Sequence, residues 1–253
     1  MHPTKVYGHR GAMGEYPENT LLSFEQAILQ GVDGLELDVQ LTKDGEVVVI
    51  HDEMLDRTTN GTGFIKDWTL GEIKQYSAGA NFTKFPKYKP EWEIEAVPTL
   101  QEVLELLQDH PHIELNIELK TNHFRYEGIE EKVLELVNLY GEGRNIIYSS
   151  FHLPSILKLK VLDPFVEIAW LIHQPIPHPN EYVEIFGLEA LHVAKDIILA
   201  SPYQYKETLK RLRVWTANST DEIKQLLDLQ VNAIITDYPE KALFFRSERT
   251  LYI

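Results

Sequence analysis

Acidic and apolar side chains alternate in two stretches of the chain. In residues 34–40 the apolar side chains share one face of a strand, while Glu36 and Asp38 share the other. Residues 113–120 repeat this pattern and place Glu118 on the polar face. Taken alone, such alternation more often describes a strand whose polar face meets water. If both strands belong to a covered barrel, their carboxylates point into its interior, where a divalent cation with oxygen ligands would offset their charge.

Histidines and cationic side chains follow the ends of early strands. His9 and Arg10 come directly after a first short strand, and His51 follows another; Lys120 ends the stretch that carries Glu118. Histidine can act as an acid or a base near neutral pH, and arginine and lysine neutralise phosphate oxygens. His9 and Arg10 alone would fit a surface turn equally well. Combined with the carboxylates, the set favours metal-assisted hydrolysis of a phosphate ester.

The composition restricts the partners that the protein can bind and the cellular compartment in which we expect it. The chain has 253 residues and a formal net charge of −15, which repels polyanions, so we expect no nucleic-acid partner. It has no cysteine, which excludes disulfides and thiolate metal sites and is compatible with a reducing compartment. No signal segment precedes the first strand, and no run approaches the roughly 18 apolar residues of a membrane span. We therefore expect a cytoplasmic protein without an integral membrane segment.

Strands and helices alternate along the chain. Eight predicted strands precede helices, and 253 residues is close to the length typical of a TIM (β/α)8 barrel, an α/β fold. Residues 47–50 return after the turn at Asp44-Gly45 and stay outside the barrel. Residues 55–92 break the rhythm, and we expect either a lid or an ordered loop without function. Asn19 or Thr20 is the predicted N-cap of the first helix; another helix is predicted at residues 203–209.

Several short motifs occur in a fixed order along the chain. They are Gly8-His9-Arg10-Gly11, Pro17-Glu18-Asn19-Thr20, Glu36-Leu37-Asp38-Val39, Val49-Ile50-His51-Asp52, Ile117-Glu118-Leu119-Lys120, Val214-Trp215-Thr216 and Ile235-Thr236-Asp237-Tyr238-Pro239. Each motif alone is weak, but the ordered set resembles the glycerophosphodiester phosphodiesterase family over nearly the whole chain. The resemblance implies a single TIM barrel over residues 1–253 with a small insertion after the second barrel strand, at about residues 53–97.

The resemblance also implies a role for each matching residue. It implies one divalent cation, Mg²⁺ or Ca²⁺, on Glu36, Asp38 and Glu118, and two catalytic histidines, His9 and His51. Substrate-binding positions carry over to Arg10, Glu18, Asn19, Lys120 and Trp215, although Trp215 fits barrel packing equally well. Residues 189–201 look less typical of the family. The remaining histidines match no motif, and only His152 and His192 are placed where they could line the mouth.

Together with this resemblance, the residues predict a metal-dependent hydrolase that cleaves glycerophosphodiesters, small-molecule phosphodiesters, to an alcohol and glycerol 3-phosphate. One alternative is a lysophospholipase D-type enzyme on the same fold, because aromatic side chains of the insertion could hold an acyl chain. A second alternative is a non-catalytic barrel that keeps a cation for structure; the presence of both histidines argues against it. The metal, the head-group alcohol, the division of roles between the histidines, the attacking oxygen and the oligomeric state stay open.

Overall fold

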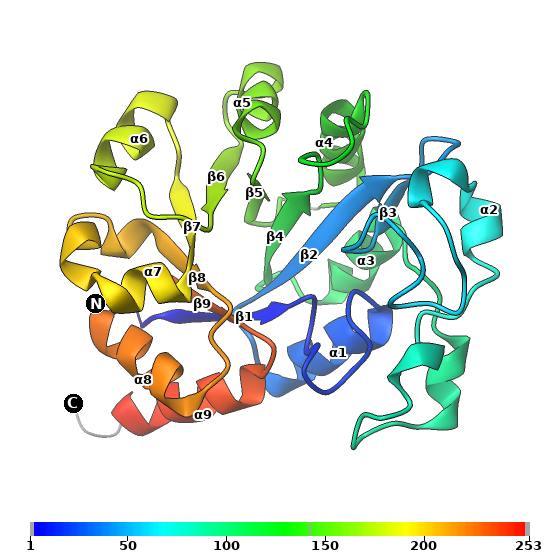
Figure 1. Cartoon of the computed structure of the whole chain (residues 1–253), viewed down its shortest axis with the longest axis horizontal. Coiled ribbons are helices and arrows are strands. Elements are labelled where there is room, and N and C mark those ends of the chain that lie inside the picture. The colour runs from blue at the N-terminus through cyan, green and yellow to red at the C-terminus, as the bar shows by residue number, and fades with distance from the viewer. Residues whose placement is uncertain (1–2, 142, 251–253) are drawn as a thin grey trace.

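The computed structural model describes residues 3–141 and 143–250, and its core is a closed barrel of parallel strands (Figure 1). The barrel closes because the first strand pairs with both the second strand and the last. The sequence-based prediction of a TIM barrel is thus confirmed. The described residues form eight barrel strands, β1 Lys5–His9, β2 Gly34–Leu41, β4 Glu114–Leu119, β5 Ile146–Ser150, β6 Glu167–Ile172, β7 Ala190–Ala194, β8 Leu212–Trp215 and β9 Ala233–Thr236.

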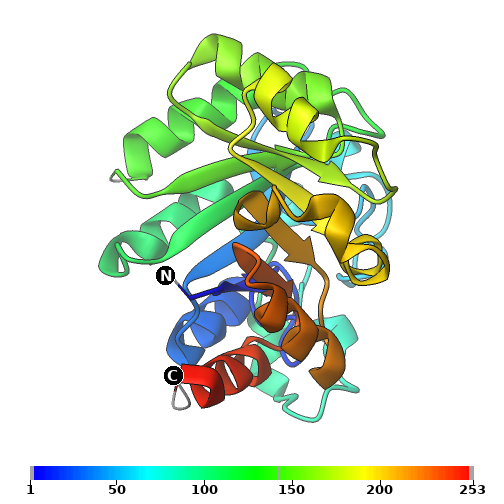
Figure 2. The same ribbon diagram turned by 90° about the vertical axis from the view of Figure 1, so that its left-hand side faces the viewer.

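Helices cover the outer face of the barrel (Figure 2). Leu35, Leu37 and Val39 of β2 are fully buried in the outer core beneath these helices, as the alternation predicts. Every side chain of β2 is buried, so its acidic residues lie in the interior and not in bulk water. The helices are α1 Leu21–Gln30, α3 Leu100–Leu106, α4 Ile129–Tyr140, α5 Leu153–Leu162, α6 Pro179–Phe186, α7 Lys195–Ala200, α8 Thr220–Leu229 and α9 Pro239–Thr250.

Local capping signals fix the ends of α1. The Thr20 hydroxyl accepts a hydrogen bond from the Ser23 backbone N–H, so Thr20 and not Asn19 is the N-cap. Gly31 ends the helix at a φ of 91°, which glycine adopts without steric cost. Because α1 begins directly after Thr20, the residues between β1 and α1 form a loop at the carboxyl end of the barrel.

Two helix assignments differ from the sequence-based prediction. The helix predicted at residues 203–209 is wrong: Pro202–Tyr205 and Leu209–Arg211 are short 3-10 turns, and α7 ends earlier, at Ala200. Pro202 has no backbone N–H and therefore cannot continue α7. No residue range was predicted for the C-terminal helix α9, which follows the last barrel strand. It packs beside α1, and Arg246 of α9 donates a hydrogen bond to Asp33 just before β2.

An insertion separates β3 (Val47–Val49) from α3, as predicted. β3 pairs antiparallel with β2 outside the barrel. The insertion contains a short helix, α2 Leu70–Ile73, and forms a small core with β3 in which Leu55, Ile73 and Val48 are buried together. It lies beside β2 and β3 in Figure 1, next to the carboxyl end of the barrel. Within the described ranges, no helix combines the length and apolar character needed to cross a membrane.

Candidate active site

Strand register brings the predicted site residues to one end of the barrel. His9 of β1 lies opposite Glu36 of β2, and Asp38 of β2 lies opposite Glu118 of β4. His9 and Glu118 lie at or near the carboxyl ends of β1 and β4, and the register brings Glu36 and Asp38 of the longer strand β2 level with them. Active sites of TIM barrels lie at this end. A cavity at this end is lined by most of the predicted residues and by several hydrophobic side chains. Its lining includes His9, Arg10, Glu36, His51, Glu118, Lys120, Phe151, Leu171, Trp215 and Ile235.

Three buried carboxylates form the acidic part of the site. Glu36, Asp38 and Glu118 each offer an oxygen, and these oxygens all lie within 4.8 Å of one another. Burial and the charges of the other two carboxylates raise the pKa of Glu36 well above its usual range. Burial also acts to raise the pKa of Asp38, but the nearby Arg10 and Lys120 outweigh it and hold that pKa below the usual range. The pKa values of these two neighbouring carboxyl groups are therefore displaced in opposite directions.

The cluster fits a hard divalent cation. Among the described residues, none donates a hydrogen bond to the buried Oδ1 of Asp38, and Nζ of Lys120 lies 3.7 Å from it, beyond hydrogen-bond distance. A buried carboxylate oxygen without a donor is costly, and a bound cation would reduce that cost. An all-oxygen set of three carboxylates is the donor chemistry that Mg²⁺ and Ca²⁺ prefer. These residues are therefore suited to hold such an ion.

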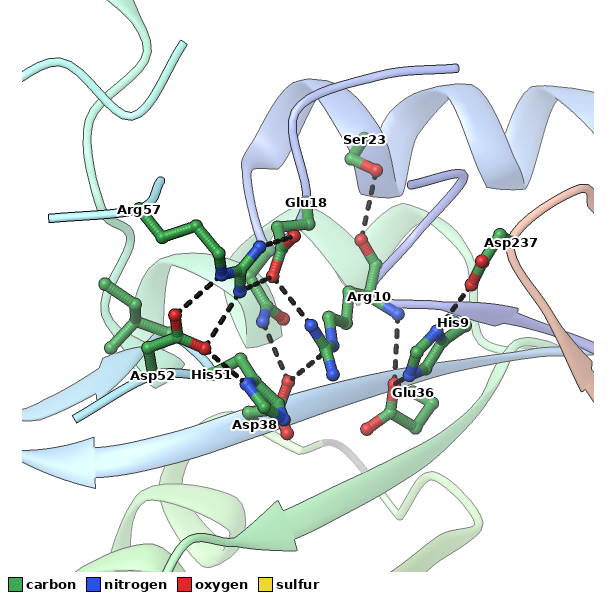
Figure 3. Close-up of polar contacts among 12 residues, drawn as sticks. His9, Arg10, Glu18, Ser23, Glu36, Asp38, His51, Asp52, Arg57 and Asp237 are labelled. Carbon is green, nitrogen blue, oxygen red and sulfur yellow. Dashed lines mark hydrogen bonds and ion pairs between the residues drawn. The ribbon is translucent and has the colours of Figure 1, made fainter. Parts of the chain in front are cut away.

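His9 is oriented by a carboxylate from the far end of the chain. Its Nδ1 lies 2.6 Å from Oδ1 of Asp237, and its Nε2 lies 3.8 Å from Oε2 of Glu36 (Figure 3). Burial acts to raise the pKa of Asp237, but the hydrogen bonds with His9 and Asn218 and the nearby positive charge together outweigh it, and the pKa falls. An ionised Asp237 accepts the Nδ1 proton, so Nε2 is the nitrogen left for proton transfer beside the carboxylate cluster.

His51 has the same arrangement on the other side of the cluster. Its Nδ1 lies 2.7 Å from Oδ1 of Asp52, and its Nε2 lies 3.1 Å from Nζ of Lys120. Burial acts to lower the pKa of Lys120, but Glu118 and Asp38 outweigh it and raise that pKa to about 12. A protonated lysine can only donate, so Nε2 of His51 accepts and Nδ1 carries the proton. Each histidine thus holds its Nδ1 against a carboxylate.

The loop after β1 supplies a cation to the cluster. Arg10 has a φ of 49°, and its backbone N–H donates to Oε2 of Glu36 at 3.0 Å. Its guanidinium lies 2.8 Å from Oε1 of Glu18 and 3.2 Å from Oδ2 of Asp38. Gly11 follows at a φ of 84°, where an added Cβ would collide with Ser23. The turn therefore needs glycine, and it aims Arg10 at the acidic cluster.

Glu18 and Asn19 lie behind the cluster and not on the cavity wall. Glu18 binds the Arg10 guanidinium, and the Asn19 side-chain amide donates to Oδ2 of Asp38 at 2.9 Å. Neither belongs to the described residues that line the cavity. The structure places them where they orient Arg10 and Asp38. Trp215, in contrast, lines the cavity and packs its ring edge-on against Phe151, at 5.6 Å between ring centroids.

Sequence reasoning assigned no role to three charged residues of this site. Asp52 and Asp237 each follow a strand within a motif that the sequence did show, so an acidic residue next to a strand end was the available signal. Arg57 lies in the insertion, and no local pattern links it to the site. His152 does not line the cavity among the described residues, and its Nδ1 lies 3.1 Å from the Ser155 hydroxyl.

His192 lies at the floor of the cavity, deep in the barrel. It is fully buried, and burial together with the charge of Arg213 lowers its pKa well below the usual value. Arg213 in turn donates to the Tyr7 hydroxyl at 2.8 Å, and that hydroxyl donates to Glu114. A second polar network therefore fills the barrel beneath the site and keeps His192 neutral.

Comparisons with known proteins agree with this geometry. Residues 9–241 match the Glycerophosphoryl diester phosphodiesterase family. A glycerophosphodiester phosphodiesterase of Bacillus altitudinis is 40% identical over 252 residues, which cover 97% of this chain and 99% of the relative. A glycerophosphodiester phosphodiesterase of Caldanaerobacter subterraneus subsp. tengcongensis is 39% identical over 240 residues, covering 94% of this chain and 95% of the relative.

The comparison with solved structures agrees with the sequence comparison. The structure of an Oleispira antarctica phosphodiesterase in complex with the product sn-glycerol-3-phosphate matches with a TM-score of 0.84 at 28% sequence identity. The match covers 97% of each chain. Family motif, sequence identity and barrel architecture all extend over nearly the full described chain, and the protein therefore belongs to the glycerophosphoryl diester phosphodiesterase family.

Proposed function

We propose that the protein hydrolyses glycerophosphodiesters to an alcohol and glycerol 3-phosphate, with one divalent cation and two histidines. The observation that carries this proposal is the pairing of His9 and His51. Each turns Nδ1 toward a carboxylate; Nε2 of His9 faces Glu36, and Nε2 of His51 faces Lys120. Family membership and the similarity to a phosphodiesterase that binds sn-glycerol-3-phosphate support the same substrate class.

Glu36, Asp38 and Glu118 would hold the cation, Mg²⁺ or Ca²⁺. When bound, such an ion polarises a phosphoryl oxygen and offsets the charge that develops on it. Arg10 and Lys120 line the same cavity, and their positive charges attract the phosphate anion and hold it against the histidines. Their guanidinium and ammonium groups also limit the repulsion between the substrate and the three carboxylates.

The two histidines would move the protons of hydrolysis. One removes a proton from the attacking oxygen as it forms the new P–O bond, and the other protonates the leaving alkoxide as its P–O bond breaks. With water as the attacking group, one diester and one water give one alcohol and one glycerol 3-phosphate. Asp237 and Asp52 keep each ring in the tautomer that this exchange requires.

The acyl-chain alternative loses its main support in this structure. The seven aromatic side chains of the insertion were the candidates to hold such a chain. None of them belongs to the described residues that line the cavity. Most instead pack against one another or against the small core of the insertion, as Phe85 does on Trp92 and Trp68 does on Tyr76. The seven are Phe64, Trp68, Tyr76, Phe82, Phe85, Tyr88 and Trp92.

Substrate charge gives the direct test of this proposal. A diester carries one negative charge, whereas a monoester carries close to two near neutral pH. The diester also offers a leaving alcohol on both sides of the phosphorus. We expect kcat/KM for a glycerophosphodiester to exceed that for glycerol 3-phosphate by at least about 10²-fold, the size of one acid–base contribution. Equal kcat/KM values for the two substrates would refute the diesterase assignment.

A further inference from the structure

Arg57 of the insertion joins two carboxylates that serve different parts of the site. Its Nε and Nη2 donate to Asp52 at 2.6 and 2.9 Å. Its Nη1 and Nη2 donate to Glu18 at 2.6 and 2.8 Å. Figure 3 shows the guanidinium between the two acids. Four hydrogen bonds from one planar group fix the separation and the tilt of both carboxylates.

Each of these carboxylates also contacts a group at the cavity. Asp52 holds Nδ1 of His51 at 2.7 Å, and Glu18 accepts from Arg10 at 2.8 Å. Arg57 itself does not belong to the described residues that line the cavity. Arg57 therefore affects the cavity indirectly. It contacts Asp52, which contacts His51, and it contacts Glu18, which contacts Arg10.

Burial distinguishes this arrangement from an ordinary surface ion pair. The Arg57 side chain is 47% exposed, but that of Glu18 is only 3% exposed. Without Arg57, the buried Glu18 would keep a single cationic partner among the described residues, Arg10. Arg10 would then be drawn toward Glu18 and away from Asp38, because an undercompensated buried charge is costly. Asp52 would keep His51 but lose the contact that fixes its own orientation.

We propose that Arg57 is a positioning residue that holds His51 and Arg10 in their working orientations at once, and so makes the site depend on the folded insertion. This inference rests on the proposed function. Lysine cannot replace Arg57 fully, because a single ammonium group cannot make two bidentate contacts. Through Arg57 the insertion thus contributes to the site.

The test compares Arg57→Met with Lys87→Met. Lys87 also ties the insertion to the loop after β1, through an ion pair with Glu15 at 2.8 Å, but neither residue contacts the site. In the metal-supplemented enzyme we expect Arg57→Met to lower kcat for a glycerophosphodiester by about 10- to 100-fold, as loss of an outer orienting partner does. Arg57→Lys should lower kcat less than Arg57→Met does. Lys87→Met should keep kcat within about threefold of the wild-type value, because an exposed ion pair contributes little.

Two double-mutant cycles separate positioning from a general structural role. If Arg57 acts through His51, adding Arg57→Met to His51→Ala should lower kcat further by much less than it lowers kcat in wild type. If it acts through Arg10, Arg57→Met should weaken the binding of sn-glycerol 3-phosphate in wild type but not in Arg10→Ala, measured by calorimetry. Such non-additivity is expected only for groups that act as a unit.

Additive losses in both cycles would overturn the proposal, as would an Arg57→Met enzyme with unchanged kcat and unchanged product affinity. The wild-type assay keeps this result distinct from the proposed function. If the wild type does not turn over the diester, the proposed function fails. If the wild type is active and the cycles are additive, only the role of Arg57 is refuted.

Discussion

Replacing His9 or His51 by alanine should slow hydrolysis of an alkyl diester by about 10²–10⁴-fold for each substitution, the usual contribution of one general acid or base. An alkoxide is a poor leaving group at neutral pH, so loss of the acid should cost as much as loss of the base. The rings occupy opposite sides of the carboxylate cluster and are held by separate carboxylates, Asp237 and Asp52. Each substitution should therefore remove one proton-transfer step and leave the other residue in place.

An aryl diester separates the two roles. Its leaving group is stable as an anion and needs little acid assistance. The variant that lacks the acid should recover most of its rate on this substrate, and the variant that lacks the base should not. Steady-state kinetics of both variants on both substrates checks this. If neither substitution slows the alkyl diester by tenfold, the two-histidine mechanism fails; equal losses on both substrates would refute only the division of labour.

Neutralising a carboxylate of the cluster should remove the metal together with the activity. We expect Glu36→Gln, Asp38→Asn and Glu118→Gln each to weaken divalent-ion affinity and lower activity by more than about 100-fold, the upper end of what loss of an outer partner costs. The fold should survive, because neutral amides relieve the repulsion among the buried acids. Calorimetric titration with Mg²⁺ or Ca²⁺ gives the affinity, and circular dichroism checks the fold.

Proton release offers a second signature of the same site. The pKa of Glu36 is raised well above its usual range by burial and by the neighbouring carboxylates, so we expect the metal-free protein to hold a proton there. A cation requires the carboxylate form, so binding should expel that proton, and affinity should rise with pH up to the pKa of Glu36. Titration in two buffers with different ionisation enthalpies measures the release.

Glu114→Gln is the matched control for these substitutions. Glu114 lies on β4, the strand of Glu118, but its partners are Lys5, Tyr7 and Asn145 at the opposite end of the barrel. Glu114→Gln should therefore leave ion affinity unchanged. Unchanged affinity in all three cluster variants would show that the cation, if any, binds elsewhere.

The sequence predicted the barrel and the acidic cluster because both follow from strand periodicity. Apolar residues at alternate positions of β2 identify its outer face, which leaves Glu36 and Asp38 for the interior. Parallel register then brings Glu118 opposite Asp38. The N-cap of α1, predicted at Asn19 or Thr20 and found at Thr20, was equally local, since it depends on a single residue type in a defined backbone position.

Other features could not be predicted because they join distant parts of the chain. His9 and Asp237 are 228 residues apart, and only barrel closure brings them together. Arg57 reaches Glu18 across 39 residues from an insertion without periodicity. The predicted helix at residues 203–209 failed because Pro202, together with the preceding helix, sets the local structure there.

The central claim, metal-dependent hydrolysis of a glycerophosphodiester, is tested most directly by one turnover measurement on the wild-type protein. The enzyme is first stripped with a chelator and assayed on a water-soluble glycerophosphodiester, and then assayed again after addition of Mg²⁺ or Ca²⁺. The account predicts that the stripped enzyme loses at least about 10²-fold in rate, since metal assistance contributes several kcal/mol. Added ion should restore the rate, with alcohol and glycerol 3-phosphate released in equal amounts. Full activity in the presence of chelator, or no diester hydrolysis under any ion, would contradict it.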